Sequence, residues 1–171
     1  RGEDAFVAAR EALAFVDDAL PRYDPPDLAR AGVLESPRNV RLCAPVPRPG
    51  KIVGVARNYA AHAAEVGSEP PPEPVLFLKA SSAVVGPDDE IVLPHASREV
   101  DYEGELAVVI GARLRDVDES RALAGVAGYT VANDVSARDY QGVRGQHFIG
   151  KSCDSFAPLG PVLVTPGELP D

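Results

Sequence analysis

Short apolar segments separated by turns dominate the sequence from Lys51 onward, and they constrain the fold more than any other feature. Their lengths, their β-branched residues and the proline and glycine between them are typical of β-strands. A long amphipathic helix is expected only over residues 3–20, where apolar residues recur at steps of three and four. Shorter helices are expected after Asn58 and over residues 116–128. Because strands outnumber these irregularly placed helices, we expect an α+β, mainly β fold rather than a doubly wound parallel sheet.

The expected strands lie within residues 51–56, 74–86, 88–95, 101–111, 129–137 and 155–166. The N-terminal part differs, because residues 21–42 are rich in proline and polar side chains and indicate a linker. We therefore divide the chain into a small N-terminal segment over residues 1–49 and a second domain over residues 50–171. The chain starts at Arg1, has no methionine and ends after a turn-like LVTPGELPD, so we expect an incomplete part of a longer protein.

Composition and charge argue against several classes of function. The net charge of −9 disfavours non-specific binding to nucleic acid or to an anionic membrane surface. No stretch reaches the roughly 18 apolar residues that a membrane-spanning helix needs. Cys43 and Cys153 match no CxxC pattern, so we expect two reduced thiols in a cytoplasmic protein. Neither a P-loop nor a G-x-S-x-G nucleophile elbow is present.

Two acidic residues stand at the head of the strongest expected strand. Glu103 and Glu105 are two residues apart, so their side chains point to the same face of the strand. The two carboxylates repel each other, and a hard cation such as Mg²⁺ or Mn²⁺ would remove that repulsion. Asp134, in the turn after another expected strand, could supply a third carboxylate ligand. The alternatives are a solvated strand end for the glutamates and a plain Asn133–Asp134 turn.

A second candidate cluster lies on the short helix after Asn58. His62 and Glu65 are three residues apart and therefore share a helix face. The glutamate could orient the imidazole and raise its basicity, as a general base for water requires. The alternative is a surface pair without a catalytic role.

Several basic and amide side chains could bind an anionic substrate. Arginine offers a bidentate fork for a carboxylate, and lysine a point charge for a developing oxyanion. The candidates are Lys79, Arg138, Gln141 and Lys151. Taken singly, each is more typical of an ordinary surface charge.

Five segments, taken in order, resemble the fumarylacetoacetate hydrolase family: KIVGVARNYAAHAAE, PVLFLKASSAVVG, VDYEGELAVVIG, GYTVANDVSARDYQ and GKSCDSFAPLGP. The resemblance runs from about Lys51 to Pro161 and is closest to the smaller bacterial type, because the KIVGVA strand lacks an additional aspartate. It implies a mixed β-roll or distorted barrel with few helices, usually in a homodimer. The family continues beyond this point with a substrate loop and further strands, so this chain would leave the barrel incomplete.

The resemblance also implies a site and a reaction. It implies Glu103, Glu105 and Asp134 as ligands of Mg²⁺ or Mn²⁺, His62 and Glu65 as the water-activating pair, Lys151 as the group that stabilises negative charge on the substrate, and Arg138, Gln141 and Lys79 as residues at the substrate. The implied reaction is metal-dependent C–C bond hydrolysis or isomerisation of an acylpyruvate-like or 2-hydroxy-dienoate substrate in aromatic catabolism, with hydrolysis favoured. Alternatives are an oxaloacetate decarboxylase or tautomerase with the same metal-enolate site, and an inactive family member that serves as a binding protein.

Overall fold

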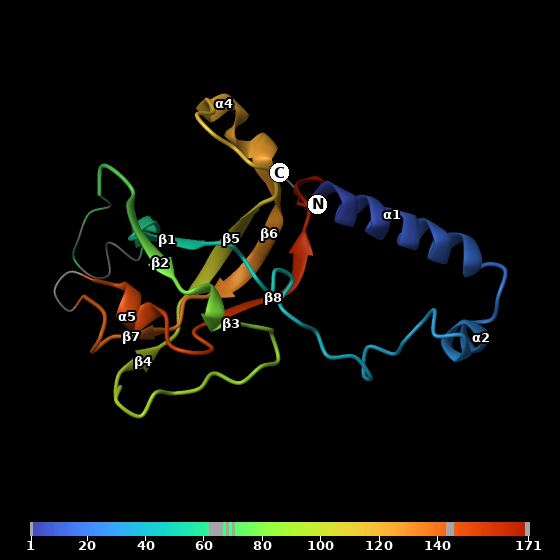
Figure 1. Cartoon of the computed structure of the whole chain (residues 1–171), viewed down its shortest axis with the longest axis horizontal. Coiled ribbons are helices and arrows are strands. Elements are labelled where there is room, and N and C mark those ends of the chain that lie inside the picture. Colours follow the sequence, from blue (N-terminus) through green and yellow to red (C-terminus); the bar gives the residue numbers. More distant parts are fainter. Residues whose placement is uncertain (1, 62–66, 68, 70, 143–145, 170–171) are drawn as a thin grey trace. The chain divides into compact units, whose positions relative to one another are not determined.

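The apolar segments from Ile52 onward form strands in the computed structural model, which describes residues 2–61, 67, 69, 71–142 and 146–169 (Figure 1). β1 (Ile52–Ala56) pairs antiparallel with β2 (Val75–Lys79), and β4 (Val100–Asp101) pairs antiparallel with β7 (Ser136–Ala137). A further sheet has the strand order β3-β8-β6-β5, formed by β3 (Val84–Val85), β8 (Ala157–Val164), β6 (Val126–Asn133) and β5 (Gly104–Ile110). In it, β8 runs antiparallel to β6 and parallel to β3.

The helices are mostly short. They include α1 (Gly2–Ala19), α2 (Pro25–Arg30), α4 (Glu119–Ala122) and α5 (Phe148–Lys151), with single turns of 3-10 helix η1 (Ser81–Ala83), η2 (Leu123–Gly125) and η4 (Pro166–Glu168). The described residues contain more strand than helix, and none of their sheets closes into a barrel. The expected mainly β mixed fold is therefore confirmed. No helix in the described part of the chain is both long and apolar enough to cross a bilayer.

The chain divides into two compact units. The larger unit contains the described residues of Leu42–Ala107 and Tyr129–Val164. Its buried core consists of Ala83, Val135, Ala137, Phe156 and Ala157. Because Val135 and Ala137 belong to this core, their packing holds the backbone that follows Asp134 in place.

The other unit contains α1, α2 and α4. The predicted N-terminal helix is confirmed as α1, but its apolar Leu13 and Phe15 are 63% and 61% exposed. Burial in this unit is confined to few side chains, such as Leu28 of α2.

Two expected elements are wrong. Residues 88–95 form no strand, because their backbone bonds to side chains instead of to a neighbouring strand. Val92 N donates a hydrogen bond to Ser155 Oγ, and the Asp89 carboxylate accepts one from Gly86 N and closes a turn. The expected helix over residues 116–128 is reduced to α4 and one turn of η2. Gly125 O accepts a hydrogen bond from Gly111 N, and β-branched Val126 already begins β6.

Candidate functional site

The β1–β2 ribbon presents different chemistry on its two faces. Its register places Gly54 opposite Phe77 and Ile52 opposite Lys79. A Cβ on residue 54 would lie 2.2 Å from Phe77 Cζ, so the phenyl ring could not keep its position over any other residue there. The opposite face carries the exposed side chains of Val53, Val55, Leu76 and Leu78. Lys79, at the end of β2, is only 6% exposed.

Asp134 lies between two buried lysines. Lys79 Nζ is 2.5 Å from Asp134 Oδ1 and also donates to the carbonyl of Val135. Lys151 Nζ is 2.6 Å from Asp134 Oδ2. Each oxygen of this carboxylate therefore has its own ammonium partner. Burial lowers the pKa of Lys79, and the neighbouring Lys151 charge lowers it further, while Asp134 acts in the opposite direction.

Lys151 is positioned by the close approach of α5 to β7. A Cβ on Gly150 would lie 2.7 Å from both the Ala137 carbonyl oxygen and the Gln141 backbone nitrogen, so only glycine allows this packing. The Lys151 side chain is 2% exposed, and its Nζ lies 5.1 Å from the centroid of the Phe77 ring. That distance is in the range of a cation–π interaction.

Glu103 connects Lys151 to Arg138. Its Oε2 accepts a hydrogen bond of 2.8 Å from Lys151 Nζ, and its Oε1 one of 2.5 Å from Arg138 Nη1. The backbone holds Glu103 beside the Asp134 turn, because Asp134 N donates to Glu103 O and Glu103 N donates to Asn133 Oδ1. Burial raises the pKa of Glu103, but bonds and charges from Lys151 and Arg138 outweigh it and hold the pKa below its usual value.

Arg138 extends this network outward. Its Nε and Nη2 donate to Oδ2 of Asp101 over 3.1 and 2.7 Å, and its Nη1 donates to Gln141 Oε1 over 2.7 Å. The ionised groups therefore alternate in sign along what we call the ion-pair series: Asp101, Arg138, Glu103, Lys151, Asp134 and Lys79. The side chain of Asp101 is 48% exposed and that of Lys79 only 5%, so the series leads from solvent to the interior.

Asp101 and His147 also contact this network, although neither was predicted from the sequence as a site residue. Asp101 lies two residues before Glu103, as Glu103 lies two before Glu105, so the sequence has an acidic residue at every second position. This spacing could have indicated Asp101 as a third acidic residue on the same face. The His147 ring lies 5.7 Å from the Phe77 ring, and its Nδ1 is 3.4 Å from Gln141 Nε2. No spacing rule connects these three residues in the sequence.

Glu105 forms no ion pair with a described residue. Burial raises its pKa, and the charges of Glu103 and Asp134 raise it further, although the Tyr59 hydroxyl acts in the opposite direction. Glu105 is therefore an additional negative charge beside a series that is otherwise balanced.

The donor chemistry fits a hard divalent cation, because Glu103, Glu105 and Asp134 offer only carboxylate oxygens. Glu103 and Asp134 already share one cation, because each accepts a hydrogen bond from the Lys151 ammonium. Burial and the charges of Glu103 and Asp134 raise the pKa of Glu105, so a positive charge beside it would stabilise its ionised form. Among the described residues, no group of His, Cys, Asp and Glu is already arranged to hold a metal ion.

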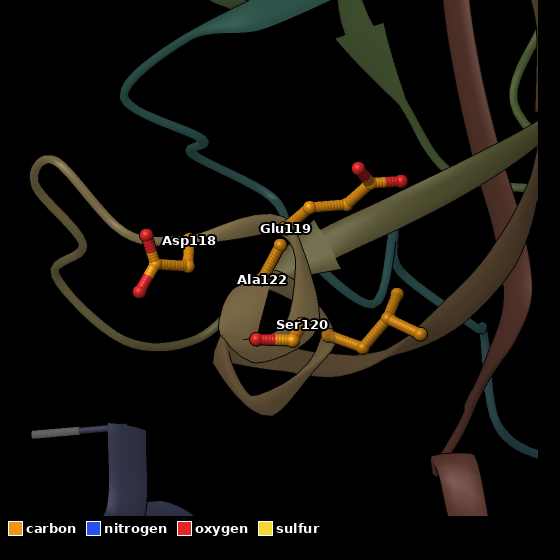
Figure 2. Close-up of a pocket in the computed structure, with 5 residues that line it drawn as sticks. Asp118, Glu119, Ser120 and Ala122 are labelled. Atoms are coloured by element: carbon orange, nitrogen blue, oxygen red, sulfur yellow. The ribbon is translucent and has the colours of Figure 1, made fainter.

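The structure thus brings Lys79, Glu103, Asp134, Arg138, Gln141 and Lys151 into one connected network. The expected pair His62 and Glu65 lies outside the described residues. Figure 2 shows a surface pocket in the other unit, lined by Asp118, Glu119, Ser120, Ala122 and Leu123, and it contains none of the expected site residues.

Comparison with known proteins gives a consistent assignment. Residues 51–171 match the family model described as fumarylacetoacetate (FAA) hydrolase C-terminal. Human oxaloacetate tautomerase FAHD2A, a mitochondrial protein, is 45% identical over 100% of this chain and 50% of its own sequence. The chain therefore spans about half the length of the curated relatives it matches.

Solved structures are similar in both sequence and fold. The 5-carboxymethyl-2-hydroxymuconate delta-isomerase from Mycobacterium smegmatis is 48% identical with a TM-score of 0.67, over 75% of this chain and 51% of that one. The fumarylacetoacetate hydrolase from Exiguobacterium antarcticum is 45% identical with a TM-score of 0.68, over 77% of this chain and 48% of that one. The names of these relatives include isomerases, tautomerases and hydrolases.

Proposed function

The chain belongs to the fumarylacetoacetate hydrolase family, and from that premise we propose that the whole protein isomerises the enol of a small 2-oxo acid. The single observation that carries this proposal is the buried Lys151 ammonium, which donates to both Glu103 and Asp134. A buried cation held by two carboxylates can stabilise negative charge that develops on a substrate oxygen. An enolate oxygen is such a charge.

The reaction requires only the relocation of a proton. The enol loses its O–H proton and a substrate carbon gains one, so no other reactant is consumed. Lys151 Nζ would donate a hydrogen bond to the substrate oxygen as its charge grows. Arg138 and Gln141 lie further out along the network and would orient the substrate carboxylate.

A divalent metal is proposed as the cofactor, either Mg²⁺ or Mn²⁺. Glu103, Glu105 and Asp134 would hold it, and when bound it would polarise the 2-oxo group as a Lewis acid. We also propose a homodimer, as the family resemblance implies. The identity to a 5-carboxymethyl-2-hydroxymuconate isomerase supports a 2-hydroxy-dienoate substrate, and the identity to oxaloacetate tautomerases supports oxaloacetate.

The second candidate is hydrolysis of a C–C bond in an acylpyruvate-like substrate. The 45% identity to a fumarylacetoacetate hydrolase favours it. It requires a base that activates water, the task expected for His62 and Glu65.

The test uses the full-length protein with added Mg²⁺ or Mn²⁺ and then with EDTA. Decay of the enol absorbance of oxaloacetate or of a 2-hydroxy-dienoate, without release of a second product, supports isomerisation. Lys151→Met should remove most of this activity, whereas the exposed Lys51→Met should retain it. Cleavage of acylpyruvates alone would support the hydrolase. If no substrate is converted and Glu103→Ala retains metal binding, both enzymatic proposals are wrong.

A further inference from the structure

We propose that Asp101 is a positioning residue of this site, which holds Arg138 against Glu103. The inference deepens the proposed function and rests on it for its kinetic consequence. Its structural part is independent, because it concerns only which group Arg138 contacts.

Asp101 occupies one complete edge of the Arg138 guanidinium. The Nε and Nη2 atoms of Arg138 both donate to Oδ2 of Asp101, over 3.1 and 2.7 Å. The remaining nitrogen, Nη1, then points to Glu103 Oε1 at 2.5 Å and to Gln141 Oε1 at 2.7 Å. A planar fork held along one edge has a fixed direction for its other nitrogen. Asp101 therefore determines where Nη1 donates.

The backbone places Asp101 for this task. β4 pairs with β7 so that Asp101 lies opposite Ser136, two residues before Arg138. Arg138 N donates to the carbonyl of Glu99 over 2.7 Å, which continues the pairing. The second carboxylate oxygen of Asp101 accepts from Tyr102 N over 2.9 Å. Both oxygens of Asp101 are therefore restrained before any ligand binds.

Loss of Asp101 would act on Glu103 through Arg138. Without its partner along the Nε–Nη2 edge, the guanidinium, whose side chain is 32% exposed, can rotate toward solvent. Glu103 Oε1 would then keep only the Ser136 hydroxyl, at 3.5 Å, as a described partner. Glu103 is a proposed metal ligand and a partner of Lys151. Loss of Asp101 would therefore misalign the Glu103 carboxylate and the Lys151 ammonium, although Asp101 contacts neither of them.

The test compares Asp101→Asn with two matched variants of the full-length protein. Asp101→Glu retains the charge, and Glu99→Gln removes an exposed carboxylate from the same segment. We expect Asp101→Asn to lower kcat/KM about tenfold, with the larger part of the loss in kcat, because the two hydrogen bonds from Arg138 lose their charged acceptor. Asp101→Glu should recover part of kcat, and Glu99→Gln should match the wild type.

A second readout does not depend on activity. Phenylglyoxal modification of Arg138, followed by peptide mass spectrometry, should be several-fold faster in Asp101→Asn than in the wild type or Glu99→Gln. Equal modification rates in all proteins would overturn the assignment of Asp101, as would an unchanged kcat in an active enzyme. If the wild type converts no substrate but Arg138 becomes more reactive in Asp101→Asn, the proposed function fails and the positioning role stands.

Discussion

Lys79 Nζ lies 2.5 Å from Asp134 Oδ1, and both side chains are almost fully buried. A buried ion pair does not by itself stabilise a protein strongly, because removing two charges from water costs about as much as their attraction returns. Breaking such a pair is a different matter, since the remaining charge stays buried. The Lys79–Asp134 pair therefore fixes the orientation of the Asp134 carboxylate. Each of the two charges can stay buried at low cost only while the other is present.

Replacing Lys79 with methionine should destabilise the protein by about 3 kcal/mol, because Asp134 Oδ1 would remain buried without its ammonium. Urea unfolding followed by circular dichroism measures the change. The exposed Lys51→Met serves as the control and should stay within about 0.5 kcal/mol of the wild type. A double variant, Lys79→Met with Asp134→Asn, should recover part of the loss, and failure to recover any would contradict this account.

Glu103 and Glu105 should contribute opposite slopes to the pH dependence of stability in metal-free protein. The pKa of Glu103 is lowered on folding, so its contribution is complete above the unfolded value of about 4.3 and is lost as the pH falls through the lower folded pKa. The pKa of Glu105 is raised, so the folded state binds its proton more strongly, and stability falls as the pH rises from about 4.3 through the raised value.

The two glutamine variants test these signs at neutral pH. Glu103→Gln should lower the free energy of unfolding, because Lys151 and Arg138 lose a carboxylate partner. Glu105→Gln should raise it slightly, on the order of 0.5 kcal/mol after solvent screening, because a repelled charge is removed. Parallel urea titrations from well below pH 4 up to pH 7 cover both ranges, because the slope from Glu103 lies below its unfolded pKa and that from Glu105 lies above it. Slopes of the same sign would refute the assignment.

Divalent cations should raise the melting temperature of the wild type in a concentration-dependent way, as any ligand of the native state does. In Glu105→Gln, the rise in melting temperature on adding the cation should be smaller than in the wild type, whereas the melting temperatures of the two proteins in EDTA should differ less. Glu99→Gln is the control and should respond to Mg²⁺ and Mn²⁺ as the wild type does. An equal shift in Glu105→Gln and wild type would remove Glu105 from the proposed ligands.

Gly150→Ala should displace α5, because the added methyl would approach the Ala137 carbonyl oxygen and the Gln141 backbone nitrogen to 2.7 Å. We expect a loss of about 2 kcal/mol in unfolding free energy, as in other overpacked sites, together with loss of activity through Lys151. Gly104→Ala is the matched control, since a Cβ there has no neighbour within 4 Å. Thermal unfolding and the enol assay measure the two effects.

Local rules predicted the parts of the site that lie within one segment. Alternation along a strand predicted a shared face for Glu103 and Glu105, although β5 begins only at Gly104, and the turn after a β run predicted Asp134 as a site residue. The structure connects Glu103 and Asp134 through Lys151, although their catalytic and metal-binding roles remain predictions.

The contacts that sequence reasoning missed depend on pairing between distant segments. Asp101 reaches Arg138 only because β4 pairs with β7 in a particular register, and His147 reaches Phe77 only because α5 contacts β2. The expected strand at residues 88–95 failed for a related reason. A hydroxyl from Ser155, distant in sequence, satisfies a backbone group that a neighbouring strand would otherwise satisfy.

The ion-pair series has a consequence for the order of folding. Lys79 and Asp134 are 55 residues apart, and Glu103 and Lys151 are 48 apart. Closing such long loops costs chain entropy before the contacts repay it, so local pairs such as β1–β2 are expected to form first. Until the loops close, these charged groups stay hydrated in water. Protection of Lys151 from an amine-reactive label during refolding would therefore time the arrival of the native topology, and not the earlier collapse of the chain.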